Sequence, residues 1–549
     1  MDPVEGTLKL TKRNVKIPDK FTLVTSPPSG ILKVTIIQTR DVPFPTASST
    51  PPGGGTLLGP LPYAIVDFDK SQIISRARYQ YLGVDEPPIW AGEEESSVHD
   101  IRRYTYCFDV TRQAELQIWL YQPAARGDDV NTDVFLGKAV FRPLLTGTSE
   151  TTREWLSLHN GVGAISIIAQ FISTEPLISM VPLEPFEVIS GSRKSLSSLS
   201  YTVILRYVSP FQVLPLIMAF TDLLSHVRRK KNTNLDYASV VLRKGKHDSL
   251  AVRRAASQID NPFIVPLKFG IEIPGGGKHY LLCAFLHHYD LSEYLESVEC
   301  LELAEARFYA AQLLSALECL HDLGILCGRL QPSNIYIDFT GYLVLGDFDL
   351  YIQDISGNPW LQPPSHDAKT YTPIELDKSD QPNVDRYLAP ELRSTQGDSH
   401  DIALTADWWS FGVVLHQLLT GRLPSHTAND ADIPLSIPIP PNGIPIPRPA
   451  EDLLAKLLSR NPLQRLGAHG SEEIKSHPFF DEMDWPKLRR KEYIPGFRPP
   501  LVDERALLLK TERPCGEPDL SKFRISRDEE DRLRAIFSGF TTRAQNRAS

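Results

Sequence analysis

The pattern of hydrophobic residues changes once along the chain, and this change sets the number of folded units. Within residues 30–172, short β-rich runs such as 32–37 and 116–120 alternate with turns rich in proline and glycine. That spacing is typical of a β-sandwich. After Glu184 a short β-rich portion gives way to helical periodicity, clearest in residues 304–323. We therefore expect an all-β unit followed by a larger α+β unit.

Charge and cysteine content argue against several classes of protein. A net charge of −9 argues against a general nucleic-acid binder. The six cysteines form no CxxC pair, so we expect neither a zinc site nor a disulfide framework. We expect instead that the protein resides in a reducing compartment. The most apolar stretch, residues 207–221, contains Pro210 and Pro215 and falls short of the roughly 20 residues of a spanning helix. We expect a soluble, cytoplasmic protein, with docking at a membrane surface left open.

The β-rich part resembles the strand and loop sequence of a C2 domain. The resemblance is carried by residues 61–63, 88–90 and 133–137. Calcium-binding members of that family need several carboxylates that converge from two loops, because Ca²⁺ takes roughly 6–8 oxygen ligands.

Most of those carboxylates are replaced here. The resemblance places Leu61 at the first-loop aspartate, and Tyr121 and Pro123 at the third-loop pair, while Asp133 keeps its carboxylate. We therefore expect no calcium binding. The expected roles of this unit are docking onto the neighbouring domain, onto a protein partner or onto a lipid surface.

The larger unit carries motifs that closely resemble the C-lobe of AGC-type serine/threonine protein kinases. These motifs are residues 407–414 (DWWSFGVV), 461–467 (NPLQRLG) and 476–480 (SHPFF). The resemblance implies that Glu391 forms a buried ion pair with Arg465 and that Asp407 is structural. Because losing one partner of a buried pair costs about 3–5 kcal/mol, retention of both indicates a folded C-lobe.

Other parts of the same family are recognisable before and after the C-lobe. Residues 261–267 resemble the segment after helix αC, and residues 280–285 resemble the strand that leads to the hinge, which implies nucleotide contacts at Ala284 and Leu286. Near the end of the chain, Phe537, Phe540 and Thr541 resemble the hydrophobic motif, in which two aromatics dock on the small lobe beside a phosphorylated residue.

The nucleotide clamp of the family is altered in this sequence. Phosphoryl transfer depends on a Gly-rich loop over the phosphates and on a lysine paired with a helix-C glutamate. Residues 192–244 contain no glycine, Val240 stands at the ATP-lysine position, and Val252 stands at the glutamate position. We expect the two valines to touch in the small lobe, because a matched apolar pair can be as stable as a buried ion pair.

The catalytic loop has also lost its base. Residues 327–334 align with this loop, and Arg329 occupies the position of the catalytic aspartate. A general base contributes roughly 10²–10⁴ in rate, so a permanent cation in its place predicts inactivity. Gly328 replaces the arginine that pairs with activation-loop phosphate, and Gln331 replaces the lysine aimed at the transferred group.

Some positions remain open to two interpretations. Asn334 and Asp347 match the metal-binding residues, so they either hold Mg²⁺ and ATP weakly or serve local hydrogen bonding. Asp380 falls at the phosphorylatable threonine of the activation segment. It either mimics phosphate or is an ordinary surface acid, and we favour the second because Gly328 removes its main partner.

These observations predict a multidomain chain with an all-β C2-like sandwich followed by an α+β bilobal kinase-like domain and an AGC tail. The preferred function is that of an inactive kinase, a pseudokinase, acting as a scaffold or allosteric partner of an active kinase or its regulators. An active kinase that uses a displaced lysine such as Lys194 and a nucleotide-binding switch without transfer are the alternatives. The expected boundaries are 1–28 (extension), 29–175 (sandwich), 185–480 (kinase-like domain) and 481–549 (tail).

Overall fold

The structure is a computed structural model of the chain, and every structural statement below concerns the residues that it describes. These are residues 30–44, 61–77, 89–91, 104–124, 130–145, 151–173, 186–190, 226–230, 236–243, 259–272, 278–284, 289–323, 325–328, 330–346, 351–352, 386–393, 403–424 and 437–501.

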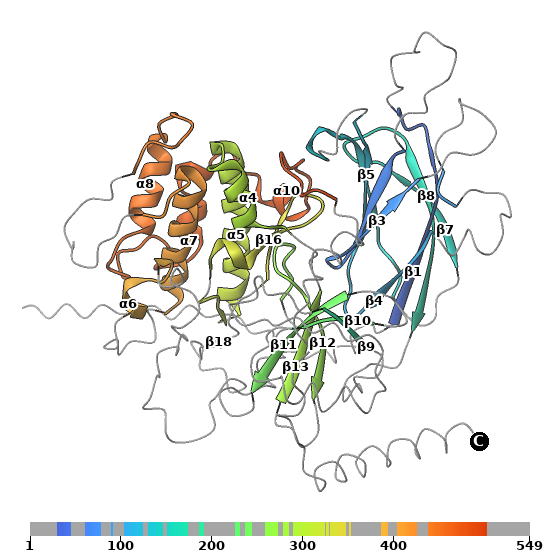
Figure 1. The fold of residues 1–549 in the computed structure, drawn as a ribbon, viewed down its shortest axis with the longest axis horizontal. Helices are drawn as coiled ribbons and strands as arrows, with labels where there is room; N and C mark the ends of the chain where they lie inside the picture. The colour runs from blue at the N-terminus through green and yellow to red at the C-terminus, as the bar shows by residue number, and fades with distance from the viewer. Residues whose placement is uncertain are drawn as a thin grey trace, which may run out of the picture.

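The N-terminal part consists of two four-stranded antiparallel sheets (Figure 1). The first sheet has the order β4-β1-β8-β7, built from β1 (Gly30–Arg40), β4 (Thr105–Val110), β7 (Thr152–Ser157) and β8 (Ala164–Ser173). The second has the order β3-β2-β5-β6, built from β2 (Tyr63–Phe68), β3 (Ser71–Arg76), β5 (Leu116–Gln122) and β6 (Val134–Phe141). Their facing side chains form one hydrophobic cluster, so the two sheets pack face to face.

Strand β2 is buried on both of its faces. Ala64, Val66 and Phe68 point into the cluster between the two sheets. Tyr63 and Ile65, on the opposite face, belong to a different cluster that is centred on the helices of the second unit. Because successive side chains of a strand alternate between faces, the run YAIVDF, in which Asp67 is the one charged residue, serves two cores at once.

A five-stranded antiparallel sheet follows in the chain, with the order β12-β13-β11-β10-β9. Its strands are β9 (Phe186–Ser190), β10 (His226–Lys230), β11 (Asp236–Arg243), β12 (Leu267–Glu272) and β13 (Lys278–Ala284). The run predicted as a strand at residues 280–285 corresponds to β13 with shifts of one or two residues, and Val240 lies on β11.

The helical part begins after a short strand, at Asp290. The side chain of this aspartate accepts a 2.9 Å hydrogen bond from the backbone N–H of Glu293 and caps the first helix. The helices are α4 (Leu291–Val298), α5 (Leu303–Asp322), α6 (Pro390–Arg393), α7 (Ala403–Thr420), α8 (Arg448–Leu457), α9 (Glu472–Lys475) and α10 (Trp485–Arg489). The short strands are β14 (Tyr289–Asp290), β15 (Ile325–Leu326), β16 (Ile335–Ile337), β17 (Leu343–Leu345) and β18 (Tyr351–Ile352), and the 3-10 turns are η1 (Val130–Thr132), η2 (Pro332–Asn334) and η5 (Pro478–Phe480).

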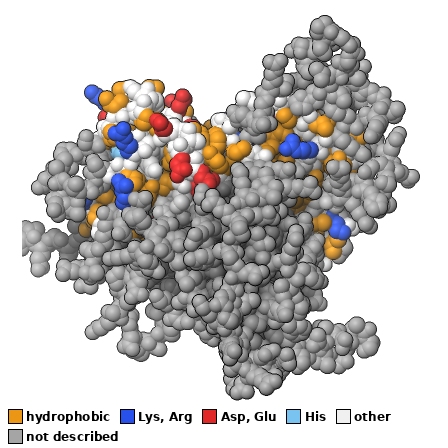
Figure 2. All heavy atoms as spheres, viewed as in Figure 1, with side chains coloured by type: hydrophobic (Ala, Val, Ile, Leu, Met, Phe, Trp, Pro, Cys, Tyr) orange, Lys and Arg blue, Asp and Glu red, His pale blue; other side chains and the backbone are white. Residues whose placement is uncertain are grey.

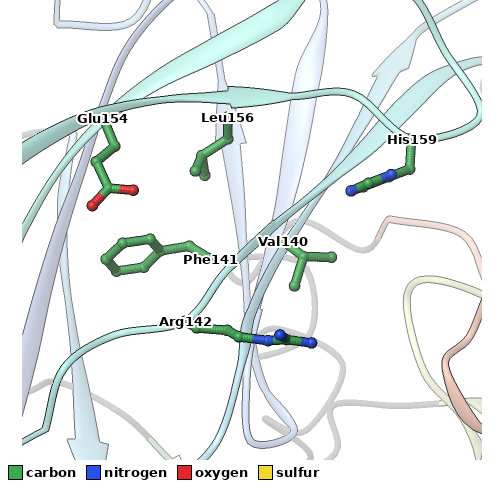
Figure 3. Close-up of a pocket in the computed structure, with 6 residues that line it drawn as sticks. All are labelled: Val140, Phe141, Arg142, Glu154, Leu156 and His159. Carbon is green, nitrogen blue, oxygen red and sulfur yellow. The ribbon is translucent and has the colours of Figure 1, made fainter.

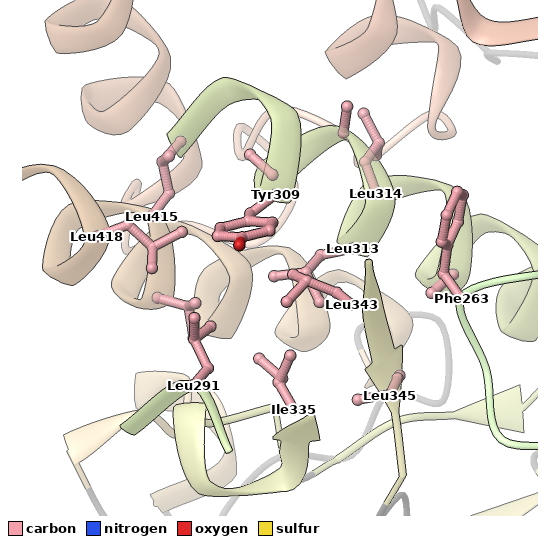
Figure 4. Close-up of a cluster of buried hydrophobic side chains, with 14 of the residues drawn as sticks. Phe263, Leu291, Tyr309, Leu313, Leu314, Ile335, Leu343, Leu345, Leu415 and Leu418 are labelled. Carbon is pink, nitrogen blue, oxygen red and sulfur yellow. The ribbon is translucent and has the colours of Figure 1, made fainter. Parts of the chain in front are cut away.

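The hydrophobic core of the helical part surrounds α5 and includes side chains from α4, α7, β16 and β17 (Figure 4). Leu313 and Leu314 of α5 pack with Leu415 and Leu418 of α7, and Phe263 joins them from the segment before β12. Together with the five-stranded sheet, this arrangement fits a bilobal kinase domain, with the sheet as the small lobe and the helices as the large lobe. Among the residues described, no helix combines the length and apolar character needed to cross a membrane.

Candidate active site

The buried carboxylate of Asp407 fixes the start of the segment that aligns with the catalytic loop. Asp407, on α7, accepts hydrogen bonds from the backbone N–H groups of Cys327 at 2.8 Å and Gly328 at 2.9 Å. Its Oδ2 also lies 2.8 Å from Nε2 of His321, at the end of α5. The predicted structural residue Asp407 therefore joins two helices to the start of the loop. His321 was not singled out from the sequence.

Gly328 has a backbone reason to be glycine. Its φ is +69°, in the left-handed region that side chains with a Cβ rarely adopt. The sequence alone explained this residue only as the loss of a phosphate-binding arginine. The structure adds that the glycine allows the turn in which both amides face Asp407.

Asn334 lies at the end of η2 and is fully buried. Its backbone carbonyl accepts a 3.1 Å hydrogen bond from the backbone N–H of Gly346, the residue that precedes Asp347 in the chain. One backbone hydrogen bond therefore links Asn334 to the residue before Asp347, and these are the two positions predicted to bind metal.

Several predicted site residues lie outside the described residues or are described only through their backbone. Val240 pairs with Leu281 in the β11–β13 ladder, and Ala284 pairs with Tyr237. The residues outside the described ranges are Arg329, Asp347, Val252, Leu286, Asp380, Phe537, Phe540, Thr541 and Lys194. The predicted contact between Val240 and Val252 is among the expectations that stay predictions.

Two positions that serve the Mg·ATP site in the family carry other residue types in this sequence. Val240 occupies a strand position paired to β13, where the family needs an amine, and it offers no donor to a phosphate. Arg329, the residue after Gly328, stands at the position where the family has a proton acceptor. Within the described ranges, no three His, Cys, Asp or Glu side chains gather as a metal site.

Glu391 and Arg465 form a bidentate ion pair in the large lobe. Nη1 of the arginine lies 2.6 Å from Oε1 and Nη2 lies 3.0 Å from Oε2 of the glutamate. The arginine is 1% exposed and also donates to the backbone carbonyls of Thr405 and Ser459. The pair ties α6, which closes the activation segment in the family, to the loop after α8.

The sandwich docks directly on the large lobe through aromatic side chains. Trp119 and Tyr121 of β5 belong to the hydrophobic cluster of the helical part, and the Trp119 ring meets the Tyr342 ring edge-on at 6.0 Å. Figure 2 shows hydrophobic side chains gathered where the helical lobe approaches the sandwich. Of the three roles expected for the β-rich unit, docking onto the neighbouring domain is thus observed.

The turn between β2 and β3 carries buried charges into this contact. Asp69 and Lys70 have φ values of +50° and +68°, and their side chains reach different partners. Asp69 Oδ2 lies 2.5 Å from Nζ of Lys268 in β12, while Lys70 Nζ lies 3.4 Å from Oδ2 of Asp338 in the β16–β17 turn. The turn therefore contacts the small lobe and the large lobe together.

Two ammonium groups converge on Asp338. Lys491 Nζ lies 3.0 Å from its Oδ2, in addition to Lys70. Burial alone would raise the pKa of Asp338, but the charges of Lys491 and Lys70 outweigh it and lower the pKa to about 2. Burial and the neighbouring Lys491 lower the pKa of Lys70 to about 7. Asp338 is therefore ionised at neutral pH, and its contact with Lys70 joins the large lobe to the sandwich.

A separate cavity of about 430 Å³ lies on the sandwich, far in sequence from the catalytic loop (Figure 3). It is lined by Val140, Phe141, Arg142, Glu154, Leu156 and His159 of β6, β7 and the following turn. The two strands are edge strands of different sheets, and Lys138 of β6 forms two backbone hydrogen bonds, of 2.9 and 2.7 Å, with His159, which follows β7. None of the predicted site residues lines this cavity.

Comparison with known proteins supports the kinase resemblance. The protein kinase domain family matches residues 253–480. The chain is 32% identical over 487 residues to the serine/threonine protein kinase ypkA of Aspergillus fumigatus, covering 80% of this chain and 66% of that protein. It is 31% identical over 507 residues to the serine/threonine-protein kinase gad8 of Schizosaccharomyces pombe, covering 86% of this chain and 77% of that protein.

Another relative matches a shorter part of the chain. Ribosomal protein S6 kinase alpha-2 of Homo sapiens is 34% identical over 285 residues, which is 50% of this chain and 36% of that protein. The chain spans just under two thirds of the length of ypkA. From the helical and sheet architecture, the kinase-domain match and the coverage of gad8, we conclude that the chain belongs to the family of AGC-type serine/threonine protein kinases.

Proposed function

We propose that this protein is a kinase-fold signalling component that does not transfer phosphate and that acts as a scaffold or allosteric regulator of other proteins. One observation carries the proposal. Asp407 accepts hydrogen bonds from the N–H groups of Cys327 and Gly328, so the backbone support of the catalytic loop is kept. The next residue, at the position of the catalytic base, is Arg329. A catalytic loop that keeps its backbone support but lacks its general base supports a role in binding other proteins rather than in phosphate transfer.

The sequence changes around the catalytic loop support the same role. A permanent cation at position 329 costs about 3–5 kcal/mol of transition-state stabilisation, which is the roughly 10²–10⁴ in rate that a general base supplies. Val240 and Val252 remove the clamp on the phosphates as well. The proposed partners are an active kinase or its regulators, and the proposed location is the cytoplasm.

The activity test follows from this proposal. We expect the purified full chain to transfer no radiolabelled phosphate to generic AGC peptide substrates in the presence of ATP and Mg²⁺. Because the effects of replacing residues that act as a catalytic unit are not additive, an Arg329→Asp variant should recover little phosphate transfer. Transfer by the parent chain that an Asn334→Ala, Asp347→Ala double variant loses would mean that the protein is an active kinase with unorthodox residues.

A nucleotide-binding switch remains a second candidate because buried Asn334 keeps a metal-ligand position. Thermal unfolding with and without ATP and Mg²⁺ separates it from the scaffold. A rise in midpoint that the Asn334→Ala variant lacks would favour the switch.

For the β-rich unit we propose a calcium-independent C2-like domain. The Asp133 carboxylate is engaged by protein donors: Tyr63 Oη at 2.6 Å, the Ala124 N–H at 3.1 Å and Arg498 Nη2 at 3.3 Å. We therefore expect millimolar Ca²⁺ to leave the thermal midpoint of the full chain unchanged. Titration calorimetry that gives calcium binding tighter than about 10⁻⁴ M, near the weak extracellular modules, would contradict this expectation.

A further inference from the structure

Two adjacent residues of the chain after α10 reach into different units. Phe497 stacks on Tyr294 of α4, with ring centroids 3.8 Å apart and an interplanar angle of 17°. Arg498 extends to the sandwich instead, where its side chain is almost completely buried. The backbone N–H of Arg498 donates a 2.7 Å hydrogen bond to Oδ1 of Asn131 in η1. The pair Phe497–Arg498 therefore fixes the tail at the junction of the two units.

The guanidinium of Arg498 lies in a cage of three sandwich side chains. Its Cζ lies 3.7 Å from the centre of the Tyr121 ring. Nη1 donates to Tyr63 Oη at 2.8 Å, and Nη2 lies 3.3 Å from Oδ2 of Asp133. The Tyr63 hydroxyl donates in turn to the same carboxylate oxygen at 2.6 Å, and the Tyr63 and Tyr121 rings stack with centroids 5.5 Å apart.

The chemistry of the cage suits a planar cation better than a metal ion. A guanidinium combines a cation–π face with donors directed at a carboxylate, and it is weakly hydrated, so its burial is less costly than that of an ammonium. Ca²⁺ would require several more oxygen ligands than the Asp133 carboxylate supplies. Two of the cage residues, Tyr121 and Asp133, are positions that the C2 resemblance assigns to the calcium-binding loops.

We propose that the sandwich has a guanidinium-binding site, formed by Tyr63, Tyr121 and Asp133, and that its ligand is Arg498 of the tail of the same chain. The arginine takes the place at which a related domain would take a cation from solution. The site anchors the tail to the sandwich permanently, and no second messenger is needed to occupy it.

Chemical rescue tests the site in the full-length protein. We expect Arg498→Ala to lower the thermal midpoint by several degrees, because Asp133 and the aromatic faces lose their cation. Millimolar methylguanidinium chloride should raise the midpoint of this variant, while an equal concentration of sodium chloride should not. The parent chain, in which the cage is filled, should not respond.

Two matched variants control for general effects of arginine loss. Arg490 lies in the same tail segment but is exposed and pairs with Glu492 at the surface, so Arg490→Ala should lose little stability and show no rescue. Adding Tyr121→Leu to Arg498→Ala should abolish the response to methylguanidinium. Equal rescue of the Arg490→Ala variant, or of the double variant, would overturn the proposal.

The calcium arm and a conservative variant complete the test. If Ca²⁺ rather than methylguanidinium stabilises Arg498→Ala, the cage is a metal site and the proposal is wrong. If Arg498→Ala does not fold, Arg498→Lys is measured instead. It keeps the charge and loses the planar fork, so its midpoint should lie clearly below that of the parent, and a midpoint equal to that of the parent would overturn the proposal.

Discussion

The Asp69→Asn variant is expected to unfold well below the parent chain. The change leaves the ammonium of Lys268 and the guanidinium of Arg112 without their shared carboxylate, at a place where the lysine side chain is 0% and the aspartate 4% exposed. Breaking a buried pair by removing one partner costs about 3–5 kcal/mol, chiefly because the other charge stays buried. Urea unfolding followed by fluorescence measures the change.

Further variants separate pairing from other effects of substitution. Replacing Lys268 with methionine in the Asp69→Asn background removes the unpaired ammonium, so the double variant should recover part of the loss, with a coupling energy on the order of 0.5–3 kcal/mol. Glu115→Gln serves as the control, because Glu115 and Arg142 pair at the surface with side-chain exposures of 41% and 81%. A loss as large for Glu115→Gln as for Asp69→Asn would contradict this explanation.

The location of Asp69 gives the first prediction a second readout. The same turn reaches β12 of the small lobe through Asp69 and the large lobe through Lys70 and Asp338. Loss of the aspartate should therefore raise hydrogen exchange in β12 and its neighbour β13 as well as in β2 and β3. Exchange that rises only in the sandwich would show that the turn does not support the small lobe.

The second large effect is expected at the pair formed by Glu391 and Arg465. Glu391→Ala leaves a guanidinium with a fully buried side chain facing no carboxylate, and a loss of about 3–5 kcal/mol follows. Simultaneous replacement by Glu391→Leu and Arg465→Met should be milder, since apolar residues of similar volume can replace a buried pair. Both are measured by urea unfolding.

An exposed pair of the same lobe is the matched control for this prediction. Lys456 and Asp452 lie four residues apart on α8, at side-chain exposures of 50% and 52%. Lys456→Ala should change stability by no more than about 0.5 kcal/mol. If Glu391→Ala were equally mild, the buried pair would not be what holds α6 to the large lobe.

The large lobe was easier to predict than the contact between the units, for a physical reason. Helix α5 and the Glu391–Arg465 pair follow from periodicity and from motifs in which neighbouring residues constrain one another. The predicted helix at 304–323 differs from α5 by one residue at each end. Strand β5 was likewise visible as the β-rich run 116–120, but apolar residues on both faces of a strand do not reveal what covers each face.

The docking contact depends on charged residues that look ordinary in the sequence. Asp69 and Lys268 are 199 positions apart, and both belong to types that usually stay in solvent. Asp133 was interpreted as the remnant of a calcium site, while its partner Arg498 lies 365 positions away. Only the folded chain brings these pairs together, because their burial is a property of the interface and not of either segment.

Strands β2 and β5 each contribute side chains to two hydrophobic cores, and this sets a limit on how the protein can be divided. A fragment that begins near residue 185 would present to water the part of its core that Trp119, Tyr121, Tyr63 and Ile65 now join, including Tyr342, which the Trp119 ring contacts. A fragment that ends near residue 175 would present the outer face of its own sheet. The sequence pattern marks two domains, but the smallest piece suitable for expression, assay or exchange between relatives contains both.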